Sequence, residues 1–208
     1  MIKQGNIKHD LRISKEKDST TNREEVKLMD KIVIHSYSDE WPGLFDLTAK
    51  KLRQELGEVA MRIDHIGSTS IKGLAAKPII DIQISVESFN PIGKFQIPLE
   101  RLGYVFRKDN PEKTKRYFRE KPGDRRTHIH VRKLGSWHQQ FPILFRDYLR
   151  YHPVDMKLYE NEKYRLAETY KDNRTAYVEG KNKVFWEIIF QADRWAGEIG
   201  WEPGPSDA

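Results

Sequence analysis

Cysteine is absent from all 208 residues of the sequence. Disulfide bonds and thiolate-bound metals are therefore excluded, and a reducing compartment is favoured. No apolar run approaches the roughly 18 residues that a membrane-spanning helix needs, so we expect no membrane partner. The first residues also lack the apolar stretch of a secretory signal. Together these absences predict a cytoplasmic protein.

Charge is in modest excess on the positive side, with 37 Lys or Arg against 31 Asp or Glu and a net charge of +6. The basic side chains concentrate in residues 113–133, which hold nine Lys or Arg and two acids. Such a segment suits a partner that carries phosphate. Nucleic acid is the weaker form of this prediction, because the segment lacks the interleaved aromatic residues of a single-strand platform. The pattern also fits an edge strand protected by charge.

Apolar periodicity predicts one α+β domain over residues 30–199, with an α/β core over 30–134 and a helical part over 135–199. Residues 1–28 and 200–208 lack that periodicity, and we expect disordered tails there. Alternating apolar residues predict strands over 30–36, 59–66, 78–86, 104–108, 115–120 and 127–133. The 3.6-residue pattern predicts helices over 38–57, up to Leu102, and over 137–152, 154–170 and 175–199.

A Gly-Ser turn and an acidic residue on the next strand form the main candidate site. Residues 67–70 read Gly-Ser-Thr-Ser and follow a predicted strand, where exposed backbone N–H groups and hydroxyls can bind phosphate. Asp81 and Gln83 alternate onto one face of the following strand. A carboxylate there suits a divalent cation that bridges phosphates. An ordinary loop followed by a surface acid is the alternative.

Two histidines on a later strand extend this site. His128, His130 and Arg132 share one face of the predicted strand 127–133. An imidazole in this position can ligate a metal ion or act as a general base, and it is equally compatible with a solvated strand face. The adjacent hairpin supplies arginines whose planar forks suit phosphate.

Four segments resemble the GrpB family, a group within the nucleotidyltransferase superfamily. They read HIGSTSIKGLAAKPIIDI, HIHV, FRDYLRYHP and AYVEGKN, and the resemblance spans about residues 32–190. It implies a nucleotidyltransferase-like mixed β-sheet core with a C-terminal helical half. The superfamily pattern has a Gly-Ser turn and two metal-binding acids spaced two residues apart. Asp81 matches the first acid, and Gln83 stands in place of the second.

The resemblance and the residue patterns together define the candidate residues. The expected catalytic residues are Asp81, His128 and His130. The expected ligands of Mg²⁺ or Mn²⁺ are Asp81, Gln83 and His130. The expected phosphate-binding residues are Gly67, Ser68, Thr69, Ser70, Lys77, Arg116, Arg119 and Arg126.

Two functions follow from these candidates. The first is a metal-dependent nucleotidyltransferase that binds a nucleoside triphosphate and transfers a nucleotidyl group to a small-molecule or RNA acceptor. The second is a binding module of the same fold, without catalysis, for a nucleotide or a coenzyme-A-related molecule. Loss of the second acid at Gln83 is compatible with either, because an amide oxygen can ligate a cation without supplying charge.

Overall fold

The computed structural model describes residues 32–208 and contains one five-stranded mixed sheet with the order β1-β2-β5-β4-β3. The strands are β1 (Arg62–Ile66), β2 (Ile80–Val86), β3 (Val105–Phe106), β4 (Lys115–Arg119) and β5 (Thr127–Lys133). The central pair, β2 and β5, is parallel, and the other neighbouring pairs are antiparallel. The α+β class with a mixed sheet is thus confirmed. The expected disordered tail over 1–28 lies outside the described residues.

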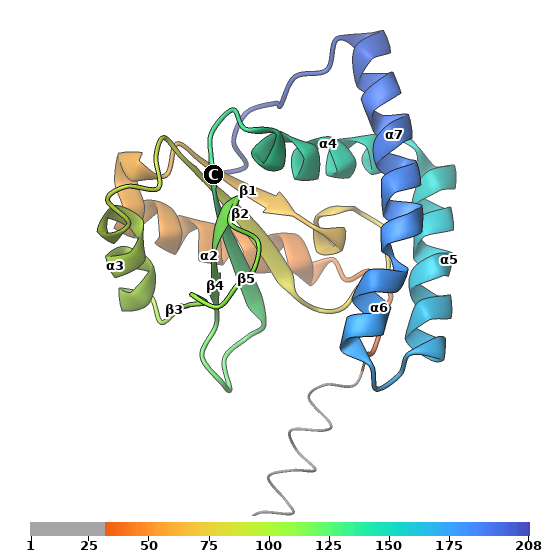
Figure 1. The fold of residues 1–208 in the computed structure, drawn as a ribbon, viewed down its shortest axis with the longest axis horizontal. Helices are drawn as coiled ribbons and strands as arrows, with labels where there is room; N and C mark the ends of the chain where they lie inside the picture. The colour runs from red at the N-terminus through yellow and green to blue at the C-terminus, as the bar shows by residue number, and fades with distance from the viewer. Residues whose placement is uncertain (1–31) are drawn as a thin grey trace, which may run out of the picture.

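Helices cover both faces of the sheet (Figure 1). They are α2 (Glu40–Leu56), α3 (Gly93–Arg101), α4 (Trp137–Tyr151), α5 (Pro153–Thr169), α6 (Arg174–Gly180) and α7 (Asn182–Ile199). None of the helices within residues 32–208 is both long enough and apolar enough to cross a membrane. The single helix expected over 175–199 is two helices, since α6 ends at Gly180 and α7 begins at Asn182.

Strand alternation sends the two sets of β2 side chains to different surroundings. The isoleucines at 80, 82 and 84 are buried in a core with α2 and α3, to which Phe45, Leu52 and Phe95 contribute. The polar residues of the same strand face the other way, toward α4 and the later helices. A second apolar cluster lies among α4, α5 and α7 and includes Leu144 and Ile188. The polar side chains of β2 therefore point into the space between the sheet and the helical half, where a site can be enclosed.

Several of the expected strands are shorter than predicted. One was expected over 30–36, and its described residues, 32–36, form one bridge, between His35 and Ala76. Another, over 104–108, pairs only through Val105 and Phe106. Residues 57–59 form a 3-10 turn, so the strand expected from residue 59 begins at Arg62.

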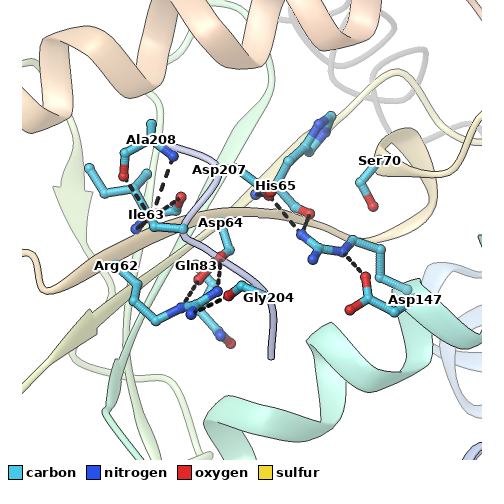
Figure 2. Close-up of polar contacts among 12 residues, drawn as sticks. Arg62, Ile63, Asp64, His65, Ser70, Gln83, Asp147, Gly204, Asp207 and Ala208 are labelled. Carbon is cyan, nitrogen blue, oxygen red and sulfur yellow. Dashed lines mark hydrogen bonds and ion pairs between the residues drawn. The ribbon is translucent and has the colours of Figure 1, made fainter. Parts of the chain in front are cut away.

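The C-terminal residues lie along the free edge of β1, whereas the sequence predicts a disordered tail (Figure 2). Ser206 Oγ accepts from the Ile63 amide at 2.8 Å, and Asp207 Oδ2 accepts from the His65 amide at 2.8 Å. Arg62 donates to the Gly204 carbonyl at 2.7 Å. The segment carries little apolar pattern because polar groups attach it, and these contacts cover edge amides that would otherwise be open to pairing.

Candidate metal and phosphate site

The parallel pairing of β2 with β5 brings three candidate residues together. The register places Asp81 opposite His128 and Gln83 opposite His130. Asp81 Oδ1 lies 3.1 Å from His128 Nδ1 and 3.4 Å from His130 Nε2. One possible ligand atom from each of Asp81, His128 and His130 lies within 4.8 Å of the others. The structure therefore contains a possible Asp/His metal site at the centre of the sheet.

Gly67 brings the turn backbone directly against the Asp81 carboxylate. Its φ is 74°, with ψ at −178°, in a region that side chains rarely adopt. A β carbon added to Gly67 would lie 2.7 Å from Asp81 Oδ2, which is closer than atoms can approach without a shift. Only glycine allows this turn to lie beside the carboxylate, so turn and acid form one unit.

Two of the three turn hydroxyls stabilise the turn itself. Thr69 Oγ1 donates to the Ile79 carbonyl at 3.1 Å and lies 3.0 Å from His65 Nε2. Ser70 Oγ donates to the Gly67 carbonyl at 2.6 Å. Ser68 and Thr69 line the cavity beside Asp81. The Ser70 hydroxyl thus bonds within the turn, and Ser70 does not line the cavity.

The Gln83 side chain is held by α4 through its amide nitrogen. It has no exposed surface, and its Nε2 donates to the Gln139 carbonyl of α4 at 2.8 Å. Gln83 does not line the cavity that holds Asp81 and the two histidines. The structure therefore does not bring this expected metal ligand to the other three side chains, because the amide is held by α4.

The three candidate arginines lie outside the cavity. Arg116 is on the opposite face of β4, and its guanidinium lies 4.3 Å from the centre of the Phe89 ring. Arg119 and Arg126 both pair with Glu120, at 2.9 and 3.0 Å. These contacts use the guanidinium groups within the hairpin, and none of the three arginines lines the cavity.

The cavity beside the cluster has a volume of about 450 Å³ and a cationic lining. Its positively charged residues are Lys77, Lys115, Lys163, Arg174 and Lys181. Lys77 alone was a sequence candidate, and its Nζ lies 4.2 Å from the centre of the Tyr177 ring. The single carboxylate of the lining is Asp81, and Lys115 also pairs with Glu112 at 2.8 Å, so the lining carries an excess of positive charge.

Two of these lysines, the buried Lys163 and the half-buried Lys181, have pKa values below the ordinary range. Lys163 is 2% exposed, and its Nζ donates to the Ala75 carbonyl. Burial, and to a smaller extent the charge of Lys181, lower the pKa of Lys163 to about 7, although the charge of Glu160 opposes this shift. Burial also lowers the pKa of Lys181, against the opposing attraction of Asp81. Burial is the main cause of both shifts, so a polyanion bound beside either ammonium group would raise its pKa again.

The ionisation of the cluster suits metal binding. Burial alone would raise the pKa of Asp81, but hydrogen bonds from His128 and His130 outweigh it and lower the pKa. Burial lowers the pKa of His130 to about 4, despite its hydrogen bond with Asp81. At neutral pH the site therefore has an ionised carboxylate and a neutral His130 imidazole, which are the forms that bind metal ions.

The chain belongs to the GrpB family, since the profile described as "GrpB protein" matches residues 31–191. The crystal structure of the conserved protein GrpB from Enterococcus faecalis is similar over 78% of this chain and 99% of that chain. Its sequence identity is 31% and its TM-score is 0.69. The family expected from the four sequence segments is thus confirmed.

Two further relatives are longer than the matched part. The UPF0157 protein YqkA of Bacillus subtilis is 37% identical over 79% of this chain and 48% of its own length. A dephospho-CoA kinase of Mycolicibacterium paratuberculosis is 31% identical over 79% of this chain and 46% of its own length. The chain thus spans about half the length of each of these proteins.

Proposed function

We propose that the chain binds a nucleoside triphosphate, with a divalent cation, in the cavity between the sheet and α5–α7. The observation that supports this most is the position of the Asp81, His128 and His130 cluster at the wall of a cavity with five cationic side chains. A triphosphate needs several cations and a metal-binding carboxylate within reach of one another. These residues meet that requirement.

Lys163 and Lys181 would bind the β- and γ-phosphates. Lys163 lies on α5 and Lys181 directly precedes α7, and both line the same cavity as Ser68 and Asp81. Their lowered pKa values mean that a phosphate charge nearby would be strongly favoured, because it offsets the cost of burying each ammonium. Ser68 and the backbone of the turn would donate to the same phosphates.

The cluster would hold the cation beside these phosphates. Asp81 and the two histidines supply one carboxylate and two imidazoles, a donor set that fits a divalent ion. Such an ion would neutralise phosphate charge when bound. The chain's own residues then orient the triphosphate, with cations at the β- and γ-phosphates and the α-phosphate toward Asp81.

The reaction we propose is nucleotidyl transfer to a small-molecule or RNA acceptor. The acceptor hydroxyl oxygen forms a bond to the α-phosphorus, and the bond from that phosphorus to the β-phosphate oxygen breaks. Pyrophosphate leaves with the electron pair of the broken bond, and the acceptor's proton passes to water. Lys163 and Lys181 would stabilise the charge that develops on pyrophosphate.

A pyrophosphate-release assay with each of the four nucleoside triphosphates tests this function. We expect release by the unmodified chain and its loss in the Asp81→Asn variant. Asp46→Asn is the matched control, since Asp46 is exposed on α2. Equal release by the unmodified chain and the Asp81→Asn variant would refute the assignment.

A module that binds without catalysis is the second candidate, and the position of Gln83 favours it. The side chain in place of the second acid is held by α4, so a single carboxylate remains in the cavity. The likeness to a dephospho-CoA kinase makes a coenzyme-A-related molecule the natural ligand to try. Binding of ATP or dephospho-CoA in the presence of chelator, with no pyrophosphate release under any condition, would favour the module.

A further inference from the structure

We infer that Asp81, His128 and His130 form a site for one transition-metal ion of the zinc class, and that Mg²⁺ is not the ion that this site selects. This inference concerns the same cavity as the proposed function. It depends on the proposed function in one respect only, namely that the bound ion lies beside the phosphates of a nucleotide. The ion itself is identified by its ligands.

The first argument is the chemistry of the ligand atoms. Two of the three are imidazole nitrogens, His128 Nδ1 and His130 Nε2, and the third is a carboxylate oxygen. Imidazole suits zinc and its neighbours in the first transition row, whereas Mg²⁺ prefers oxygen ligands in octahedral geometry. A site with a nitrogen majority therefore discriminates against Mg²⁺.

The second argument is geometric. Bonds of about 2.0–2.1 Å around a tetrahedral ion place neighbouring ligand atoms roughly 3.3 Å apart. The two distances from Asp81 Oδ1 to the histidine nitrogens are 3.1 and 3.4 Å. These two edges already have the length that such an ion requires. The remaining distance, between two nitrogens on the same strand, is within 4.8 Å and must match these two edges to complete the three-ligand face.

The third argument is the charge around the cluster. Mg²⁺ is held mainly by negative charge, and its sites supply one or two carboxylates together with substrate phosphates. Here one carboxylate is accompanied by five cationic residues in the cavity lining. The oxygen ligand expected at Gln83 is also missing, because α4 holds that side chain. The surroundings therefore oppose a hard cation, while the imidazole bonds of a transition metal depend less on charge.

The packing of the two imidazole rings fits the same conclusion. His128 Nε2 and His130 Nδ1 are buried, and neither has a hydrogen-bond partner within residues 32–208. When the inner nitrogens ligate an ion, each outer nitrogen carries the ring proton, which in metal sites is ordinarily donated to a carboxylate, a carbonyl or water. The Tyr117 ring lies 5.6 and 5.2 Å from the two imidazole centres and packs against both. The rings are thus held with their inner nitrogens toward Asp81.

Equilibrium dialysis of tag-free protein, stripped with chelator, tests the inference directly. The protein is dialysed against limiting Zn²⁺ in a large excess of Mg²⁺, without nucleotide, and its metals are measured by mass spectrometry. We expect about one equivalent of bound zinc, as in other three-ligand sites. Replacement by Co²⁺ should give the visible absorption of a nitrogen-ligated, low-coordinate ion. Absence of zinc binding, or retention of Mg²⁺ in its place, would overturn the inference.

Variants tie the bound ion to these residues. Asp81→Asn and His130→Gln should each weaken zinc binding at least about tenfold. His138→Gln is the matched control, since this histidine lies on α4 and outside the cavity. Undiminished zinc binding in both cluster variants would place the ion elsewhere and contradict the inference. Zinc binding without nucleotide binding would refute the proposed function alone, and nucleotide binding that needs only Mg²⁺ would refute the inference alone.

Discussion

Gly67 and Asp81 are so close that a single added carbon would collide with the carboxylate. The β carbon of any other residue at position 67 would lie 2.7 Å from Asp81 Oδ2. The turn that is proposed to bind phosphate and the acid that is proposed to bind metal are therefore positioned by the same contact. Substitution of one should disturb the other.

Gly67→Ala should weaken metal binding at the cluster. The substitution forces the carboxylate or the turn to shift, and the unusual backbone conformation adds about 1–3 kcal/mol of strain. Gly123→Ala is a suitable control, because Gly123 has φ of 90° with no atom within 4 Å of an added β carbon. Both variants should be less stable in urea unfolding, and only Gly67→Ala should lose zinc in dialysis. Equal metal binding by the two variants would contradict the close approach.

Lys163→Met should stabilise the free protein. Lys163 is buried with a pKa lowered to about 7, so the folded state bears the cost of enclosing an ammonium group near neutral pH. Removal of that group should raise the free energy of unfolding by about 1–2 kcal/mol, after loss of its bond to the Ala75 carbonyl. Urea unfolding at pH 6 measures this, with the exposed Lys183→Met as control. A marked loss of stability would show that the ammonium is well compensated.

The same lysine should make stability depend on pH. Its pKa is lowered to about 7 in the folded protein from an ordinary value of 10.5, so between these values the unfolded chain binds more protons. Stability therefore rises with pH across that window and is constant below it, as far as this group is concerned. The stability advantage of Lys163→Met over the unmodified chain should therefore fall steadily from pH 6.5 to pH 9. A constant difference would place the pKa of Lys163 outside this window.

Affinity for a triphosphate should change in the opposite direction. A neutral Lys163 attracts phosphate less than an ammonium, so binding of an ATP analogue should weaken as pH rises from 6 to 8.5. The phosphate itself is nearly fully ionised over most of this range. Lys163→Met should bind more weakly at pH 6 and show a smaller change with pH. Calorimetric titration of both proteins at several pH values checks the slope, and identical slopes would remove Lys163 from the phosphate site.

Asp207→Ala should release the C-terminal segment from β1. Asp207 Oδ2 accepts from Arg146 Nη1 at 2.7 Å and from the His65 amide at 2.8 Å (Figure 2). Loss of this acceptor leaves Arg146, which is 4% exposed, without one partner and should cost about 1–3 kcal/mol. Faster hydrogen exchange at the Ile63 and His65 amides would report the release. The exposed Glu202→Ala is the control, and equal exchange in both variants would contradict the proposed attachment.

Much of the fold follows from local sequence patterns. The alternation along residues 80–86 and 127–133 predicts both central strands and the shared face of Asp81 with its neighbours. The 3.6-residue stripe predicts α4 and α5. The ends of the elements are less predictable. Strand β3 pairs with β4 through two residues only, and the break between α6 and α7 falls within one continuous apolar pattern.

The candidate site is only partly readable from sequence. Asp81, His128 and His130 stand out in the sequence because they alternate onto the polar faces of two predicted strands. Lys163 and Lys181 lie far along the chain, and only tertiary packing brings them to the cavity. Lys181 lies in the AYVEGKN segment, which is the one signal that points to it. The alternation of side chains along a strand could have excluded Arg116 from the candidate site, because Arg116 and Arg119 are three residues apart and lie on opposite faces of β4. The amide of Gln83 is held by α4, a contact that no local pattern reveals.

Calorimetric titration of a non-hydrolysable ATP analogue into zinc-loaded protein tests the central claim most directly. The claim is that the cationic cavity beside Asp81, His128 and His130 binds a nucleoside triphosphate. We predict one binding site in the unmodified chain and at least about tenfold weaker binding in Lys181→Met, which corresponds to a loss of about 1.4 kcal/mol. Lys183→Met should bind as the unmodified chain does. Absence of binding to the unmodified chain, or equal affinity in Lys181→Met, would contradict the account.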